Sequence, residues 1–147
     1  MIIKIRNLRG ESVTAKEIVD QYNFSKERIE SLERKKQRIL DEPPIKVTDY
    51  SEFGYGNGGG IEDKYCDRVK EINDIDEEIR WLKQYVERVE KVFSWISKTH
   101  KQELDIMLYK YTHNKNNKAV AGFFGYSERT IERKLKVVCD KLVSVIN

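Results

Sequence analysis

Charged side chains with hydrogen-bonding groups recur along one stretch near the end of the chain. Arg129 and Arg133 are four residues apart, and Glu132 and Lys136 lie three and seven residues after Arg129. On a helix, this spacing places all four side chains on one face. Arginine offers two donors to the two major-groove acceptors of guanine, and glutamate accepts from the amino group of cytosine. Arg129, Glu132 and Arg133 therefore indicate a face that reads base edges in double-stranded DNA, with Lys136 expected on a phosphate beside it.

The other face of the same helix is apolar. From Ile131 to Leu142, apolar residues recur after four, three and four positions, which predicts a stripe buried against other elements. Ser127 precedes the helix as a typical N-cap, and Gly125 supplies the left-handed conformation that a sharp helix end needs. A shorter helix through Ala119–Phe124 comes before this turn. Two helices joined in this way form the helix-turn-helix pattern, whose second helix enters the major groove.

A further helix is predicted before this pair. Thr99 and Gln102 have the spacing of a capping box, and the segment His113–Asn117 is polar and turn-prone. Together these elements predict a small three-helix head that binds DNA. The apolar positions of the added helix are Leu104, Met107, Leu108 and Tyr111.

From residue 104 to residue 142 the chain resembles region 4 of bacterial sigma factors. Lys110-Tyr111 matches the Arg-Tyr that ends a leucine-rich helix in that family, and Ala119-Val120-Ala121 matches its Glu-Ile-Ala. Gly125-Tyr126-Ser127 matches the glycine and serine turn, whereas Lys134 stands where sigma factors often carry an apolar residue. The resemblance implies groove contacts by the second, third, sixth and seventh residues of the run that begins at Ser127, namely Glu128, Arg129, Glu132 and Arg133.

Backbone phosphates are expected to be contacted by the polar and basic residues around this set. Side chains that bind phosphate fix the register of a protein on the duplex without reading bases. The charge distribution supports this division, since His100–Asn147 carries nine basic against five acidic residues, and Ile61–Thr99 carries eight against ten. The residues expected on phosphates or at the flanks are Thr130, Lys134, Lys136, Lys115 and Lys118, with Ser127 at the start of the helix.

The first two thirds of the chain are predicted to be helical and charged. Thr14 and Glu17 have capping-box spacing and open a helix that runs to about Leu40, before Pro43-Pro44. Residues 43–60 form a glycine-rich linker. A long helix over 61–97 has apolar residues every seven positions in two series, so it must lie against another helix. The two series are Tyr65, Ile72, Ile79, Val86 and Phe93, and Ile75, Leu82, Val89 and Ile96.

The partner of the 61–97 helix is left open by the sequence. It is either the 14–40 helix, folded back across the linker as an antiparallel hairpin, or the same helix from a second copy as a homodimer. We expect a hairpin together with some self-association. The fold prediction is all-α, with a helical hairpin or coiled coil in residues 1–98 and a helix-turn-helix head in residues 99–147.

Composition argues against several classes of function. Of the 147 residues, 39% are apolar and 36% are charged, which favours long solvated helices over one large core. The chain has no apolar run of membrane-spanning length and no signal-peptide layout, so a cytoplasmic setting is expected. Cys66 and Cys139 lack metal-ligand spacing, and His100 and His113 lack companions for a catalytic triad. We therefore expect no metal, no cofactor and no enzymatic activity.

Over its whole length the chain resembles phage transcriptional regulators of the RinA and ArpU type, which join a charged helical front half to a sigma-region-4-like tail. The resemblance implies a sequence-specific activator of late phage genes that acts at promoters with RNA polymerase in the bacterial host cell. Two alternatives remain open. One is a phage DNA-packaging or structural adaptor that uses an oligomeric coiled coil and a helix-turn-helix. The other is an inhibitor whose head mimics a host factor and meets polymerase without DNA.

Overall fold

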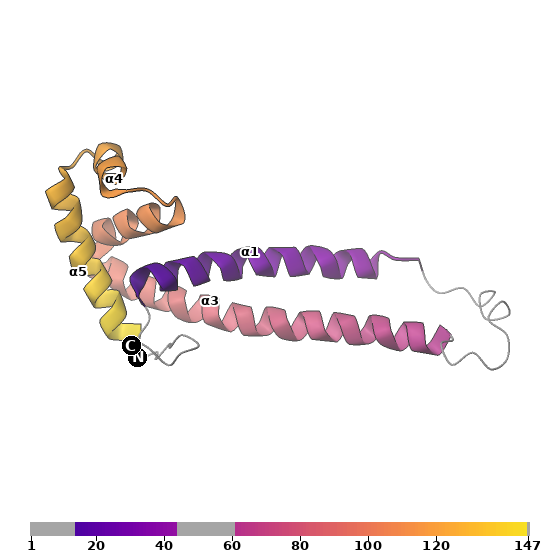
Figure 1. Cartoon of the computed structure of the whole chain (residues 1–147). Coiled ribbons are helices and arrows are strands. Elements are labelled where there is room, and N and C mark those ends of the chain that lie inside the picture. Colours follow the sequence, from indigo (N-terminus) through magenta and orange to yellow (C-terminus); the bar gives the residue numbers. More distant parts are fainter. Residues whose placement is uncertain (1–13, 44–60, 147) are drawn as a thin grey trace. The chain divides into compact units, whose positions relative to one another are not determined.

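A computed structural model describes residues 14–43 and 61–146 of the chain, and these ranges contain α-helices and turns but no strand (Figure 1). The all-α prediction is therefore confirmed for the described residues. Apart from Pro43, the predicted linker over 43–60 lies outside them. The helices are α1 (Ala15–Leu40), α3 (Ile61–Thr112), α4 (Asn117–Phe124) and α5 (Glu128–Ile146).

Helix α1 begins and ends where the sequence predicts. The hydroxyl of Thr14 accepts a hydrogen bond from the backbone N–H of Glu17 at 3.3 Å, which satisfies one of the free donors in the first turn. The helix ends at Leu40, shortly before Pro43. Proline disfavours helical geometry in the residue before it, so the helix ends ahead of that position.

The described chain forms two compact units, and both α1 and α3 contribute to each of them. The smaller unit contains residues 27–43 and 61–83. Its buried side chains are Leu32 and Ile39 from α1 and Ile75 and Ile79 from α3. The periodic positions of the two helices therefore meet within one chain, except for Tyr65, which the heptad pattern places in the seam but which is 62% exposed.

Ion pairs join α3 to α1, and to Glu42 just after α1, beside this apolar seam in the smaller unit. Within this unit, residues nearer the end of α1 tend to pair with residues nearer the start of α3, as an antiparallel pairing requires. Lys36 takes part in the shortest of these pairs at 2.6 Å. Within this unit, the partner of α3 is thus α1 of the same chain. The pairs are Arg28–Glu78, Lys35–Glu71, Lys36–Asp76, Arg68–Glu42 and Lys83–Glu33, with N···O distances of 2.6 to 3.4 Å.

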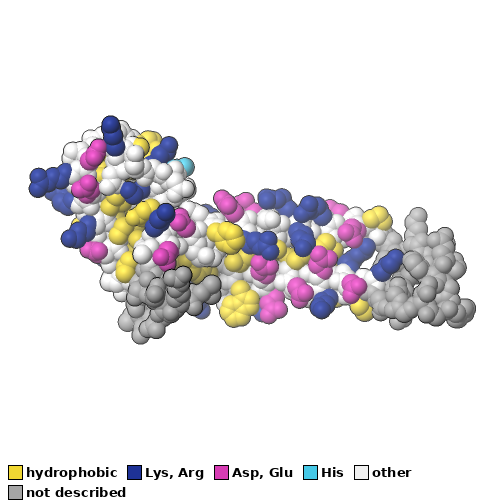
Figure 2. All heavy atoms as spheres, in the orientation of Figure 1, with side chains coloured by type: hydrophobic (Ala, Val, Ile, Leu, Met, Phe, Trp, Pro, Cys, Tyr) yellow, Lys and Arg dark blue, Asp and Glu magenta, His cyan; other side chains and the backbone are white. Residues whose placement is uncertain are grey.

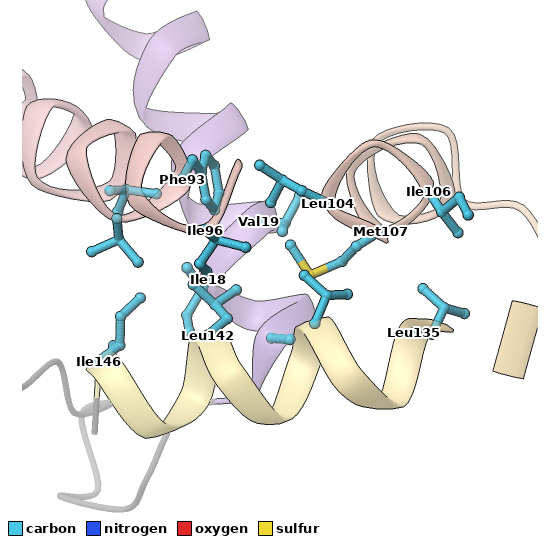
Figure 3. Close-up of a cluster of buried hydrophobic side chains, with 14 of the residues drawn as sticks. Ile18, Val19, Phe93, Ile96, Leu104, Ile106, Met107, Leu135, Leu142 and Ile146 are labelled. Atoms are coloured by element: carbon cyan, nitrogen blue, oxygen red, sulfur yellow. The ribbon is translucent and has the colours of Figure 1, made fainter. Parts of the chain in front are cut away.

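The larger unit contains residues 14–26 and 84–146 and holds the main hydrophobic core. Residues 14–26 and 84–98, which the sequence assigns to the N-terminal region, share this core with the C-terminal helices. Val92, which lies off the heptad seam, is also buried in it. Figure 3 shows side chains converging from α1, both parts of α3, and α5, among them Ile18, Val19, Phe93, Ile96, Leu104, Met107 and Leu142.

Helix α3 is broken at His100, whose φ of −135° and ψ of 46° lie outside the helical region. The sequence placed this break slightly earlier, with Thr99 as the cap of the following helix. The hydroxyl of Thr99 instead lies 2.8 Å from Nδ1 of His100 and 3.2 Å from Nζ of Lys141. The side chain of Gln102 accepts from Lys134 of α5 rather than completing a capping box. The predicted capping box is therefore corrected to a set of contacts between the break and α5.

Candidate nucleic-acid interface

The turn between α4 and α5 has the cap chemistry that the sequence predicts. Gly125 has a φ of 76°, a left-handed conformation that glycine adopts without steric cost. The backbone N–H groups of Gly125 and Tyr126 both donate to the carbonyl of Ala121, at 2.9 and 3.0 Å, which ends α4. The Ser127 hydroxyl accepts from the backbone N–H of Thr130 at 3.2 Å, which starts α5. These bonds fix the turn from both sides.

A second polar turn precedes α4. Asn116 accepts a hydrogen bond from the backbone N–H of Ala119 at 2.8 Å and so caps α4. Asn114 adopts a left-handed φ of 51°, which asparagine tolerates better than most residues. The ammonium group of Lys110 donates to the side chain of Asn117. The segment predicted as a turn from His113 to Asn117 thus connects the end of α3 to α4 within a few residues.

Helix α5 has one buried face and one exposed face. Ile131, Val138 and Leu142 have no exposed side-chain surface, and Leu135 is 7% exposed. Ile146 extends the buried stripe by one more turn than the sequence predicts. Because α5 packs through this stripe and also against α4, its opposite face is directed to solvent.

The exposed face of α5 carries three of the predicted base-reading residues together with Lys136, which was predicted to contact phosphate. Arg129, Glu132, Arg133 and Lys136 are all exposed, and none of the four has an ion-pair partner among the described residues. Figure 2 shows dark-blue Lys and Arg side chains projecting from the part of the surface formed by α4 and α5. The four residues surround a shallow hollow of about 490 Å³, lined by Ser127, Arg129, Thr130, Glu132, Arg133 and Lys136.

This hollow brings together six of the ten residues that the sequence nominates. Three of its side chains are cationic and one is a carboxylate, so its net charge favours an anionic ligand. Its polar groups include the donors of three cationic side chains and the acceptor oxygens of a carboxylate, which is the combination that base-edge readout requires. The nominated residues that do not line it are Glu128, Lys134, Lys115 and Lys118.

Lys134 differs from its neighbours because its ammonium group is engaged inside the protein. Its side chain is 18% exposed, and Nζ lies 3.1 Å from Oε1 of Gln102 and 3.7 Å from Oε1 of Glu103. Nζ also lies 5.3 Å from the centre of the Tyr126 ring, a cation–π contact. Gln102 in turn donates to the Tyr126 hydroxyl. Lys134 therefore connects the first half of α5 to the second part of α3 and to the turn.

Glu103 was not singled out by the sequence, and Gln102 and Tyr126 were predicted only as parts of a capping box and a turn. Glu103 and Lys134 are far apart in the chain, and no local spacing rule joins them. One signal was present, since Lys134 replaces an apolar residue of the sigma-factor pattern and such a position is expected to face the protein. Lys115 and Lys118, which were predicted to contact phosphate, and Glu128, which was predicted to lie in the groove, are all exposed.

Tyr111 and Cys139 add a contact between α3 and α5. The Tyr111 hydroxyl lies 3.8 Å from Sγ of Cys139. Burial raises the pKa of Tyr111 to about 12, and burial also raises the pKa of the Cys139 thiol. A thiol with a raised pKa is a poor nucleophile and a poor metal ligand at neutral pH.

Burial likewise raises the pKa of Tyr85 in α3 to about 12, and its hydroxyl lies 3.5 Å from the carbonyl oxygen of Ile18 in α1.

Within residues 14–43 and 61–146, no three His, Cys, Asp or Glu side chains are grouped so that they could hold a metal ion. None of the helices in these ranges is long and apolar enough to cross a membrane. In comparisons with models of protein families, with curated proteins and with solved structures, nothing matches this chain.

Proposed function

We propose that this protein binds double-stranded DNA sequence-specifically and regulates transcription, with α5 as the helix that enters the major groove. The single observation that carries the proposal is the exposed face of α5. Arg129, Arg133 and Lys136 project there without carboxylate partners among the described residues, while the opposite face anchors the helix in the core. A helix that is fixed on one side and offers free donors on the other can present those donors to base edges at little entropic cost.

The arrangement of α4, the turn and α5 supports this proposal. The left-handed Gly125 and the Ser127 cap make the sharp connection that a helix-turn-helix uses. In such units the second helix lies in the groove and the first crosses the backbone. Lys118 is exposed on α4 and Lys115 is exposed just before it, and in this proposal both contact phosphate.

The resemblance to sigma region 4 and to phage regulators of the RinA and ArpU type extends the proposal. It makes the chain an activator of late phage genes that acts at promoters with RNA polymerase in the bacterial cytoplasm. In this proposal the chain has no cofactor and catalyses no reaction, so its output is the occupancy of a DNA site.

The decisive experiment is a binding-site selection followed by titration of Arg133→Ala. Randomised duplexes, together with DNA from upstream of the late genes of the genome that encodes the chain, are offered to the full-length protein. At the selected site, Arg133→Ala is expected to reduce binding by roughly 1–3 kcal/mol and to relax the preference at one base pair, because a guanine loses its bidentate partner.

Arg88→Ala is the matched control for this titration. Arg88 is an exposed arginine of α3 that does not line the hollow on α5, so its removal changes the net charge equally without touching the reading face. Equal losses of binding free energy for the two variants would mean that the protein attracts DNA only through nonspecific charge. A protein that enriches no sequence and binds no duplex would refute the proposal.

A structural adaptor of phage DNA packaging is the second candidate, and one observation favours it. Large apolar side chains are exposed on the smaller unit, where Leu40, Tyr65 and Trp81 are 55% to 63% exposed. Such side chains are typical of surfaces that contact other subunits. Mass measurement of the DNA-bound protein separates the two candidates, because a stable ring of many subunits favours packaging and a monomer or dimer favours regulation.

A further inference from the structure

An aromatic cluster lies at the surface of the larger unit, formed by Tyr109 at the end of α3 and Phe123 and Phe124 of α4. The Phe123 side chain is 65% exposed, and its ring stacks on Tyr109 with the ring centres 4.2 Å apart and the planes 12° from parallel. Phe124 stands edge-on to both rings. Phe123 is therefore held rigidly with one side uncovered, which is a costly arrangement for a side chain without a partner.

The segment of the chain that carries Phe123 and Phe124 is cationic. Between Asp105 and Glu128 the sequence has no Asp or Glu, so no carboxylate of that segment neutralises its lysines. Lys115 and Lys118 are exposed and have no ion-pair partner among the described residues. The partner of the cluster is thus expected to present an apolar side chain next to carboxylates.

The chain itself carries a surface of that kind on α3. Trp81 is 63% exposed, and Asp74 and Glu77 precede it by seven and four residues, which places all three on one side of the helix. We refer to these three residues as the Trp81 face. The run from Glu71 to Glu78 contains five carboxylates and no lysine or arginine.

Ion pairing with α1 leaves two of these five carboxylates free. Glu71, Asp76 and Glu78 pair with Lys35, Lys36 and Arg28. Asp74 and Glu77 are exposed and have no such partner among the described residues. The negative charge that remains after the cis pairing is therefore concentrated beside Trp81, between Lys70 and Arg80, the cations that border the run.

We propose that the aromatic cluster of one copy docks on the Trp81 face of a second copy. Phe123 then packs against Trp81, and Lys118 and Lys115 approach Asp74 and Glu77. Each of the two surfaces supplies what the other lacks, an exposed aromatic ring among charges of the opposite sign. A nucleic acid is the less suitable occupant, because it would suit the lysines of this segment but would leave the Trp81 face uncovered.

The contact joins two different surfaces, so it is heterologous and links copies head to tail, closing into a ring or growing as a filament. It goes beyond DNA recognition and does not depend on it. None of the residues that line the hollow on α5 belongs to either surface, but Lys115 and Lys118 are also the proposed phosphate contacts, so DNA and the second copy compete for these two lysines.

Sedimentation velocity of the full chain across a concentration series, without DNA, tests the proposal. The wild-type protein is expected to gain mass with concentration. Phe123→Ser and Trp81→Ser should each weaken the association about tenfold or more, as loss of a central aromatic anchor does. Phe24→Ser is the matched control, because Phe24 is 57% exposed on α1 and belongs to neither surface, and it should leave association unchanged.

A charge exchange then identifies the occupant. Lys118→Glu and Glu77→Lys should each weaken association, and the double variant should recover most of the loss, because it restores opposite charges across the contact. Circular dichroism of each variant checks that the helices are retained. A wild-type chain that stays monomeric at every concentration overturns the proposal. The proposal is also overturned if Phe123→Ser leaves association unchanged, or if the double variant associates more weakly than both single variants. Capture of single-stranded oligonucleotides through Phe123 by a monomeric chain also overturns it and assigns the cluster to nucleic acid.

Discussion

Lys134 and Lys136 are only two residues apart in the sequence, but they lie in different environments in the structure. Variants of the two should therefore distinguish a positioning residue from a phosphate contact. Both were expected on phosphates. Lys136 is exposed and lines the hollow on α5, whereas Lys134 is 18% exposed and bonded to Gln102 and Glu103. We predict that Lys136→Met reduces the salt dependence of DNA binding and that Lys134→Met does not.

The size of the effect follows from counterion release. Each phosphate neutralised on B-DNA contributes about −0.9 to the slope of log K against log salt concentration. If Lys136 neutralises one phosphate, its loss makes the slope shallower by about 0.9. Over a fourfold rise in salt, from roughly 50 to 200 mM, the advantage of the wild type over Lys136→Met then falls by about 3.5-fold.

Lys134→Met should instead act on the fold. The pair with Glu103 is partly shielded from water, and its loss is expected to lower the free energy of unfolding by roughly 0.2–1 kcal/mol. Fluorescence anisotropy titrations of one duplex at several salt concentrations give the slopes, and urea unfolding gives the stabilities. An equal drop in slope for both variants would refute the distinction, since it would mean that Lys134 leaves Glu103 and neutralises a phosphate.

Two further predictions concern stability. Ile131→Ala should lower the free energy of unfolding by roughly 2–5 kcal/mol, because it leaves a cavity under a side chain with no exposed surface, whereas Val137→Ala, at a site 43% exposed on the same helix, should change it by less than about 0.5 kcal/mol. Urea titrations of both variants check this, and similar losses would mean that α5 is not anchored by its stripe. Stability should also fall as the pH rises above about 10, because the Tyr85 phenol, whose pKa is raised to about 12 by burial, keeps its proton in the folded state while an unfolded tyrosine loses it. Tyr85→Phe should make this fall in stability shallower, which unfolding curves of both proteins at about pH 9 and pH 11 would measure. The same pH dependence in the variant and the wild type would mean that the Tyr85 phenol is solvated.

The elements of the fold were largely predictable from local pattern. Thr14 caps α1, Ser127 caps α5, and the stripe from Ile131 to Leu142 is buried, because capping and periodicity are properties of a few neighbouring residues. The extra buried turn at Ile146 follows from the same period. Local rules were enough for these features, since each depends on one helix alone.

Features that depend on distant partners were not predictable in the same way. The heptad pattern left open whether α3 pairs in cis or with a second copy, and only long-range ion pairs such as Arg28–Glu78 distinguish these cases. Tyr65 fits the period but is exposed. Lys134 reads as a surface cation because its partner Glu103 lies on another helix. In the candidate site, the exposed face of α5 was predicted from residue spacing, whereas the contacts of Lys134 that hold α5 in place were not.

The break at His100 allows the apolar residues on both sides of it in α3 to contribute to one compact core. Phe93 and Leu104 are separated by eleven residues, as are Ile96 and Met107, and eleven residues are close to three full turns. On an unbroken rod the members of each pair would share one side but stand about 16 Å apart along the axis. Bending the rod at one residue makes that straight edge concave, so that both halves close around the same side chains of α1 and α5. A substitution that straightened residue 100 would therefore split the core while leaving the helix content almost unchanged.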